Sequence, residues 1–272
     1  MIKIFDSLDL FIFDLDGVIY EGNTVIPGAL ELLNKLSMKN KLIYALTNNS
    51  TLTRAMYSEK LEKMGINIPI DKIITSGFAT AQYLAHHGGK GKSAFIVGEI
   101  GLMLELESVG INPVNKDNLK NLPATVDFVI AGLDRNLHYD KISLALNYIL
   151  NGASFIASNN DPTLPSDIGP LPGAGVMIAA ISNCTGLKPS IIIGKPNPLT
   201  IYEILKIENI SPDKSVIIGD RFITDISAGI NAGIKTIMVL TGAGKSELDL
   251  ATKSTEKPYL IADSVADLLK LI

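Results

Sequence analysis

The feature that most constrains the fold is a repeated alternation of short apolar runs with longer amphipathic ones. Five short runs are nearly continuous in Ile, Val, Leu and Phe: Leu10–Phe13, Leu42–Leu46, Ser190–Ile193, Ser215–Ile218 and Thr236–Leu240. Such continuous runs are typical of parallel strands covered on both faces. Amphipathic stretches that fit helices lie between them, at Pro27–Met38, Thr53–Met64, Pro198–Glu208 and Thr224–Ala232. The alternation predicts an α/β fold with a parallel sheet.

Polar or charged residues follow four of the predicted strands. These segments are Asp14-Leu15-Asp16-Gly17, Thr47-Asn48-Asn49-Ser50, Gly194-Lys195-Pro196 and Gly219-Asp220-Arg221. Open parallel sheets bind their ligands at the carboxyl ends of the strands. We therefore expect the functional site at this edge of the sheet.

The spacing of these segments predicts an inserted domain. A simple strand–helix–strand crossover takes about 30 residues. The distance from Asp14 to Thr47 fits one crossover, and so does the distance from Lys195 to Asp220, whereas the stretch from Thr47 to Lys195 is far too long. After a further strand near 72–75, this stretch carries its own strand-like and helix-like runs. We expect a core made of residues 1–79 and 186–272, interrupted by an α/β domain at 80–185.

The composition limits the classes of function. The chain has 272 residues, of which 47% are hydrophobic and 19% charged, so a disordered chain is excluded. Its 28 acidic and 24 basic residues give a net charge of −4, which argues against a nucleic-acid partner. No apolar run reaches the roughly 18 residues of a membrane span. The single cysteine, Cys184, excludes an internal disulfide and fits a reducing compartment. Together with the missing membrane span, this leads us to expect a soluble, cytoplasmic protein with no membrane partner.

Carboxylates gather at the predicted edge of the sheet. Asp14 and Asp16 lie two residues apart at a strand end, so their side chains begin on the same face. Two close carboxylates in an apolar setting repel each other, and one takes up a proton unless a cation compensates. Asp220 ends another predicted strand, and Asp225 lies one helical turn beyond it. Several converging acids suit Mg²⁺, which prefers a few carboxylates plus water molecules.

Groups that suit a phosphate are expected beside these acids. Lys195 ends another predicted strand and adds positive charge next to the metal, which fits an anionic ligand. Thr47 and the backbone amides of Asn48 and Asn49, which we expect at the start of a helix, suit phosphate oxygens.

Taken in order along the chain, these residues resemble the four motifs of the haloacid dehalogenase superfamily of phosphohydrolases. The motifs are Asp14-x-Asp16-Gly17, the strand-terminal Thr47, Lys195, and Gly219-Asp220 with Asp225. Longer segments are similar to the NagD / 4-nitrophenylphosphatase branch: Phe13–Tyr20, Thr47–Ser50, Ala157–Pro165, Pro172–Gly175, Gly194–Pro198 and Gly219–Asp225. The resemblance implies a Rossmann-like three-layer core with an inserted cap of the C2 type.

The resemblance also implies a role for each acid. Asp14 would be the nucleophile that forms an aspartyl-phosphate. Asp16 would be the general acid for the leaving alkoxide and then the base that activates water. Mg²⁺ would be held by Asp14, by the backbone carbonyl of Asp16 and by Asp220, while Asp225 would orient these ligands from behind. Because a departing halide needs no acid, Asp16 favours phosphoryl chemistry over dehalogenation.

The remaining site residues follow from the same resemblance. Thr47, Asn48 and Lys195 would hold the transferring phosphoryl group. The cap residues that would face the substrate are Asn159, Asp161 and Gly173. The implied activity is hydrolysis of a small phosphorylated metabolite. The physiological substrate stays open, as does a homodimer formed through the cap.

Two other functions remain open from the sequence. One is a non-catalytic sensor of sugar phosphates or nucleotides on the same fold. The other is a phosphotransferase or mutase, although mutases of this superfamily tend to carry a C1 cap, for which too few residues separate Asp16 from Thr47.

Three further features look functional on first reading. Thr241–Ser246 is similar to a phosphate-binding P-loop, but its first glycine position is Val239, so we expect a glycine-rich turn after the last strand of the core. The neighbouring pair His86-His87 is expected at a solvated helix end rather than on a metal. A substrate contact of His138 and Tyr139, ahead of a cap helix, stays open.

Overall fold

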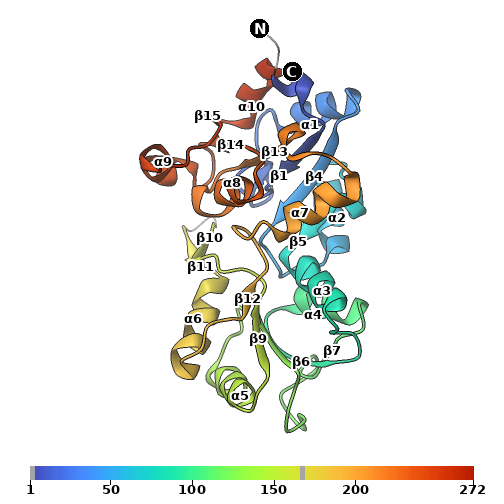
Figure 1. Ribbon diagram of the computed structural model, residues 1–272, viewed down its shortest axis with the longest axis vertical. Helices are drawn as coiled ribbons and strands as arrows, with labels where there is room; N and C mark the ends of the chain where they lie inside the picture. Colours follow the sequence, from blue (N-terminus) through green and yellow to red (C-terminus); the bar gives the residue numbers. More distant parts are fainter. Residues whose placement is uncertain (1–3, 166–168) are drawn as a thin grey trace.

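The computed structural model describes residues 4–165 and 169–272. Figure 1 shows two α/β units, one above the other along the long axis, with the C-terminus at the top of the upper unit. The upper unit is drawn mainly in blue, orange and red, so it combines the two ends of the sequence. The lower unit is drawn in green and yellow. The chain therefore leaves one unit, builds the other and returns.

A six-stranded parallel sheet forms the centre of the upper unit, in the order β15-β14-β13-β1-β4-β5. Its strands are β1 (Leu10–Phe13), β4 (Leu42–Thr47), β5 (Ile73–Thr75), β13 (Ser215–Gly219), β14 (Lys235–Val239) and β15 (Leu260–Ala262). The chain builds outward from β1 first toward β5 and later, from β13, toward β15. The order thus reverses between β1 and β13, where sheets of this kind bind ligands.

Helices cover both faces of this sheet. On one face are α1 (Ala29–Met38), α2 (Arg54–Lys63) and α10 (Val265–Leu268), and on the other are α7 (Leu199–Glu208) and α8 (Ser227–Ala232). Alternate residues of a strand point to opposite faces. In β1, Phe11 and Phe13 pack with apolar residues of α1, α2 and α10, whereas Leu10 and Ile12 pack with apolar residues of α7 and α8. All four are fully buried, which confirms the expected three-layer α/β core.

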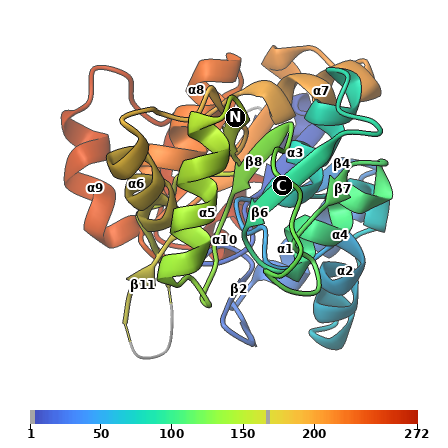
Figure 2. The same cartoon turned by 90° about the horizontal axis from the view of Figure 1, so that it is seen from below.

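A five-stranded parallel sheet forms the centre of the lower unit, in the order β12-β9-β8-β6-β7. Its strands are β6 (Ser93–Val97), β7 (Asn112–Pro113), β8 (Phe128–Ala131), β9 (Ser154–Ala157) and β12 (Ile191–Ile192). Figure 2 shows its helices on the two sides of the sheet: α3 (Ser76–His86) and α4 (Ile100–Ser108) on one side, α5 (Tyr139–Leu150) and α6 (Ala174–Thr185) on the other. The expected α/β insertion is therefore present.

Short elements complete the fold. The antiparallel hairpins are β2 (Tyr20–Glu21) with β3 (Thr24–Val25), and β10 (Thr163–Leu164) with β11 (Leu171–Pro172). The remaining helical segments are α9 (Gly244–Lys253), a π-helical segment at Phe222–Ile226, and 3₁₀ turns at Ile4–Ser7, Ile70–Lys72, Pro212–Lys214 and Leu269–Leu271. In the described part of the chain, every helix is too short or too polar to cross a membrane.

Two expectations about the strands are wrong. The run Ser190–Ile193, expected in the first sheet, contains β12 and pairs with β9 at the edge of the second sheet. A short apolar run indicates a strand without indicating which sheet it joins. The expected return to the core at residue 186 therefore precedes the last strand of the second sheet. The run Thr236–Leu240 is also not the last strand of its sheet, because β15 follows it.

Candidate active site

A cavity lies at the carboxyl edge of the six-stranded sheet, between the two units. Every core residue named for the site from the sequence lines it: Asp14, Asp16, Thr47, Asn48, Lys195, Asp220 and Asp225. From the lower unit it is lined by the three expected cap residues, which are Asn159, Asp161 and Gly173. The structure therefore brings the whole predicted set to one place, and we call it the central cavity.

Three carboxyl groups converge at this edge because neighbouring strands end there. Asp14 and Asp220 come directly after β1 and β13, which pair in parallel. Asp225 lies in the π-helical segment that follows Asp220. One carboxylate oxygen from each of the three acids lies within 4.8 Å of the others. The predicted acidic cluster is thus a direct result of the strand order.

Lys195 places its ammonium group among these acids. Its Nζ lies 2.7 Å from Oδ1 of Asp14 and 2.6 Å from Oδ1 of Asp225. It also donates a hydrogen bond of 2.7 Å to the backbone carbonyl of Leu46. The lysine side chain is only 3% exposed. Because a buried charge is tolerated only when it is paired, these contacts fix the ammonium group beside Asp14.

Burial shapes the protonation of the cluster. It raises the pKa of Asp14 to about 7, against the opposing effect of Lys195. It also raises the pKa of Asp220 well above its ordinary value, and the charges of Asp225 and Asp14 add to this effect. One lysine does not balance three acids, so the cluster favours a further cation. An all-carboxylate donor set fits a hard divalent cation such as Mg²⁺.

Asp16 enters the central cavity from the turn after β1. Burial raises the pKa of its carboxyl group to about 6, and the positive charge of Lys60 opposes this effect. The next residue, Gly17, has a φ of +82°, and a Cβ there would lie 2.5 Å from Oδ2 of Asp220. Only glycine meets both conditions, which explains the glycine that follows the Asp-x-Asp pair.

The glycine-rich segment Thr241–Ser246 forms the expected turn, at residues 241–243 directly before α9, and it also supports the acidic cluster. The backbone N–H of Ala243 donates a hydrogen bond of 2.7 Å to Oδ2 of Asp220. The hydroxyl of Thr241 donates one of 2.5 Å to the backbone carbonyl of Gly17. The segment therefore orients Asp220, a role that sequence reasoning missed. Its position at the end of β14, on the same edge of the sheet, was the available signal.

Thr47 ends β4 at the expected edge, but a helix does not begin directly after it. Residues 48–53 form a loop, and α2 begins only at Arg54. The backbone N–H of Asn49 donates to Oγ1 of Thr47 at 3.2 Å. Thus the expectation that the amides of Asn48 and Asn49 open a helix is wrong. Short polar side chains form such local hydrogen bonds and favour turns over helices.

The three cap residues reach the central cavity in different ways. Asn159, which is 3% exposed, donates a hydrogen bond of 2.7 Å to the backbone carbonyl of Asn48. Asp161 accepts one of 2.8 Å from the side chain of Asn48. Burial raises the pKa of Asp161, against the effect of this hydrogen bond. Gly173 directly precedes α6 and donates its N–H to the carbonyl of Pro162.

Sequence reasoning gave no role to Arg221, although it lines the central cavity. Its Nη2 donates a hydrogen bond of 3.0 Å to Oγ1 of Thr163 in β10, so it joins the two units across the cavity. Its place in the strand-end segment Gly219-Asp220-Arg221 was the signal that could have identified it. Six other lining residues were also not predicted: Leu133, Thr163, Leu164, Pro165, Ala174 and Thr224.

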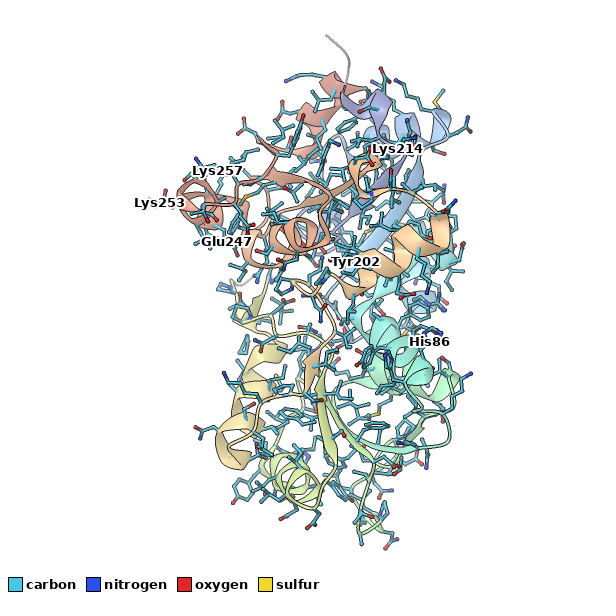
Figure 3. All side chains as sticks on the ribbon, in the orientation of Figure 1. His86, Tyr202, Lys214, Glu247, Lys253 and Lys257 are labelled. Atoms are coloured by element: carbon cyan, nitrogen blue, oxygen red, sulfur yellow. The ribbon has the colours of Figure 1, made fainter. Side chains whose placement is uncertain are left out.

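The histidines lie away from this cavity. His86 ends α3 on the outer surface of the molecule (Figure 3), and the exposed His87 follows it. The ring of His87 stacks on that of Tyr83, with 4.1 Å between the ring centroids. The expected solvated helix end is thus observed. His138 and Tyr139, at the start of α5, are exposed, and among the described residues they are not part of the cavity lining.

Comparison with known proteins agrees with this geometry. A family model described as haloacid dehalogenase-like hydrolase matches residues 11–112, and a second, described as HAD-hydrolase-like, matches residues 192–268. The chain is 35% identical over 263 residues to an acid sugar phosphatase of Staphylococcus aureus strain USA300, covering 96% of this chain and 98% of that protein.

Solved structures show the same likeness. A 4-nitrophenylphosphatase from Thermotoga maritima is 35% identical, with a TM-score of 0.88 over 98% of each chain. NagD from Escherichia coli K-12 is 33% identical, with a TM-score of 0.83 over 96% of this chain and 98% of that one. The similarity thus spans both units as well as the strand-end motifs at the central cavity. On these grounds the chain belongs to the haloacid dehalogenase-like hydrolases, in the branch of NagD and the 4-nitrophenylphosphatases.

Proposed function

We propose that this protein hydrolyses small phosphomonoesters with the help of Mg²⁺, through an aspartyl-phosphate on Asp14. The observation that carries the proposal is the position of Asp14, directly after β1, with the buried Nζ of Lys195 at 2.7 Å and two more acids beside it. Nucleophilic catalysis needs an ionised, oriented nucleophile and groups that balance the charge of the transferring phosphoryl group. The relatives named acid sugar phosphatase and 4-nitrophenylphosphatase support this substrate class.

The acids at the strand ends fit Mg²⁺ as the cofactor. Asp14, Asp220 and the backbone carbonyl of Asp16 would hold it. When bound, Mg²⁺ would supply the positive charge that keeps Asp14 ionised and balances the phosphoryl oxygens. Asp225 directs one oxygen to Lys195, and its other oxygen accepts a hydrogen bond of 3.0 Å from a backbone N–H. Both contacts support a role in which Asp225 orients the metal ligands without binding the cation directly.

The side chains can carry out two successive displacements. An oxygen of Asp14 attacks phosphorus, and the ester oxygen leaves with the electron pair of the broken P–O bond. Asp16, with its pKa raised to about 6, donates the proton that this alkoxide needs. Asp16 then takes a proton from a water molecule that attacks phosphorus, and the bond to Asp14 breaks to release inorganic phosphate. Thr47, Lys195 and the backbone of Asn48 would hold the phosphoryl oxygens throughout.

We propose that the lower unit is a C2-type cap, beginning near residue 80 and returning to the core after β12. It would exclude water from the central cavity and select the leaving group. The cap lining combines polar side chains, such as Asp161 and Thr163, with apolar ones, such as Leu133 and Leu164. This mixture supports small leaving groups that carry hydroxyl groups, as in sugar phosphates.

The test is the hydrolysis of 4-nitrophenyl phosphate with Mg²⁺, with EDTA, and by the Asp14→Asn variant. We expect turnover in the first case only, while the variant keeps its fold and its stabilisation by Mg²⁺. Near-wild-type hydrolysis by Asp14→Asn would refute the mechanism. Binding of sugar phosphates without turnover would instead support the sensor, and transfer of phosphate to a second sugar hydroxyl would support the phosphotransferase.

We also propose a homodimer formed through the cap. Tyr139 and Leu150 of α5 are 82% and 63% exposed, and Val176 of the neighbouring α6 is 46% exposed. Exposed large apolar side chains on two neighbouring helices of the cap support an interaction surface on that side. Analytical ultracentrifugation tests this proposal: a dimer that Leu150→Lys converts to a monomer supports it, and a monomeric wild type refutes it.

A further inference from the structure

The catalytic lysine lies on the segment that leaves the cap sheet. The backbone N–H of Ile193 donates to the carbonyl of Ala157 in β9 at 3.0 Å, and that of Gly194 donates to the carbonyl of Ser158 at 2.8 Å. Lys195 is the next residue. Its backbone is therefore placed by the cap, while its ammonium group has to meet Asp14 in the core.

One core side chain holds the backbone of Lys195. Oδ1 of Asn48 accepts a hydrogen bond of 2.9 Å from the N–H of Lys195, and Nδ2 of Asn48 donates one of 2.9 Å to its carbonyl. Asn48 follows β4 and is 7% exposed. The carboxamide thus pairs with Lys195 as a neighbouring strand would, and it bridges the core to the segment that comes from the cap.

The cap fixes the orientation of this carboxamide. Nδ2 of Asn48 directs its second hydrogen to Oδ1 of Asp161 at 2.8 Å, so both N–H groups and the oxygen of the carboxamide have partners. A flipped carboxamide would turn its oxygen toward the Asp161 carboxylate and its N–H toward the N–H of Lys195, which excludes that orientation. The position of Asp161 therefore bears on the position of Lys195.

The Asn48 carboxamide packs tightly against the backbone at Gly194. A Cβ on Gly194 would lie 2.5 Å from Oδ1 of Asn48 and 2.8 Å from the carbonyl oxygen of Ser158. The backbone carbonyl of Asn48 is held in turn by Asn159 of the cap and by the hydroxyl of Ser76, at 2.7 and 2.5 Å. Glycine at position 194 lets the carboxamide lie directly against the backbone it pairs with.

We propose that Asn48 is a positioning residue: its carboxamide, oriented by Asp161 of the cap, holds Lys195 against Asp14. The phosphate-binding groups are then in place only while the carboxylate of Asp161 holds the carboxamide of Asn48. This inference rests on the proposed phosphatase function. The carboxamide already has three protein partners, which leaves the backbone of Asn48 to hold phosphate. This arrangement also gives Asp161 a role that does not depend on the leaving group.

The experiment measures competitive inhibition by inorganic phosphate, with 4-nitrophenyl phosphate as substrate and saturating Mg²⁺. Inorganic phosphate occupies the phosphoryl site but has no leaving group to reach the cap. We expect Asp161→Ala to raise the inhibition constant about tenfold and to lower kcat by a similar factor. Asp161→Asn, which keeps an acceptor oxygen for Asn48, is expected to stay within about threefold of the wild type.

Glu105→Ala is the matched control. Oε1 of Glu105, in α4 of the cap, accepts a hydrogen bond of 2.8 Å from the backbone N–H of Arg54 at the start of α2. It joins cap and core, as Asp161 does, without lining the central cavity. We expect this variant to lose stability and to keep the wild-type inhibition constant. An equal rise in Glu105→Ala and Asp161→Ala would overturn the proposal, because any loosening of the cap would then suffice.

Two further results would overturn it. One is a wild-type inhibition constant in Asp161→Ala with only KM changed, which would make Asp161 a contact for the leaving group. The other is an additive loss in the Asn48→Ala/Asp161→Ala double variant, since we expect it to be no worse than Asn48→Ala alone. If Asn48→Ala does not fold, the comparison of Asp161→Ala with Asp161→Asn decides. If the wild type shows no turnover, the proposed function fails, and calorimetric titration with inorganic phosphate tests the same ranking of variants.

Discussion

Replacement of Lys195 by methionine tests how strongly the active site depends on this buried charge. Methionine has nearly the volume of the lysine stem, so the change removes the ammonium group with little loss of packing. The ammonium group has contacts of 2.7 and 2.6 Å with the carboxylates of Asp14 and Asp225 and donates a hydrogen bond to Leu46. In Lys195→Met, the partly buried carboxylate of Asp14 and the buried carboxylate of Asp225 face each other without the lysine.

The expected loss follows from burial. Removal of one partner from a buried ion pair costs about 3–5 kcal/mol, and Lys195 is only 3% exposed. The loss depends on pH, because the folded protein raises the pKa of Asp14 to about 7 even with the lysine present. A carboxyl group whose folded pKa is raised destabilises the fold where it is ionised, so stability recovers as the pH falls through that pKa. Without Lys195 the pKa of Asp14 rises further, and the recovery begins at a higher pH.

The assay is urea unfolding of wild type and Lys195→Met in EDTA, at about pH 8 and about pH 5.5. We expect a difference of about 3–5 kcal/mol in the free energy of unfolding at the higher pH and a clearly smaller one at the lower pH. A variant that unfolds within about 1 kcal/mol of the wild type at the higher pH would refute the reasoning, as would a difference that grows on acidification.

Three more outcomes follow, two from the site and one from an ion pair between Lys72 and Glu208 that lies away from it. Mg²⁺ should raise the unfolding midpoint of the wild type more at about pH 8 than at about pH 5.5. Burial raises the pKa values of Asp14 and Asp220, so at the lower pH the cation competes with protons for these carboxylates. Equal stabilisation by Mg²⁺ at both pH values would contradict this. Arg221→Ala should raise KM for 4-nitrophenyl phosphate several-fold. Thr163→Val removes only the acceptor of the 3.0 Å hydrogen bond from Arg221 and should reproduce part of that rise. An unchanged KM in both variants would show that this contact between core and cap is dispensable. Glu208→Gln should lower the free energy of unfolding by about 1 kcal/mol at neutral pH and by less near about pH 4. The hydrogen bond from Lys72 lowers the pKa of Glu208, so the stabilisation by this pair is lost as the pH falls through that pKa. A loss that is the same at both pH values would contradict this assignment.

The strand-end motifs were predictable because they combine two independent signals. Runs such as Leu10–Phe13 indicate buried parallel strands, and the acids that follow them do not suit a buried interior. Parallel strands place those acids at one edge, whatever the details of the helices. The cluster of Asp14, Asp220 and Asp225 therefore followed from the order of the elements alone.

What could not be predicted depends on contacts between segments far apart in the sequence. The sheet that Ser190–Ile193 joins is decided by packing against β9, which a short apolar run does not encode. The partners of the Asn48 carboxamide lie 113 and 147 residues away along the chain. The strand Leu260–Ala262 is apolar but has only three residues and is half-buried, and so short a run does not by itself indicate a strand.

The central claim is that the phosphoryl group passes through Asp14. The direct measurement is an acid quench of the wild type during turnover of 4-nitrophenyl phosphate with Mg²⁺, followed by mass spectrometry of its peptides. The account predicts a phosphorylated peptide with the modification on Asp14, present in the wild type and missing in Asp14→Asn. Full turnover with the phosphate on another residue, or the same phosphopeptide yield in Asp14→Asn, would contradict it.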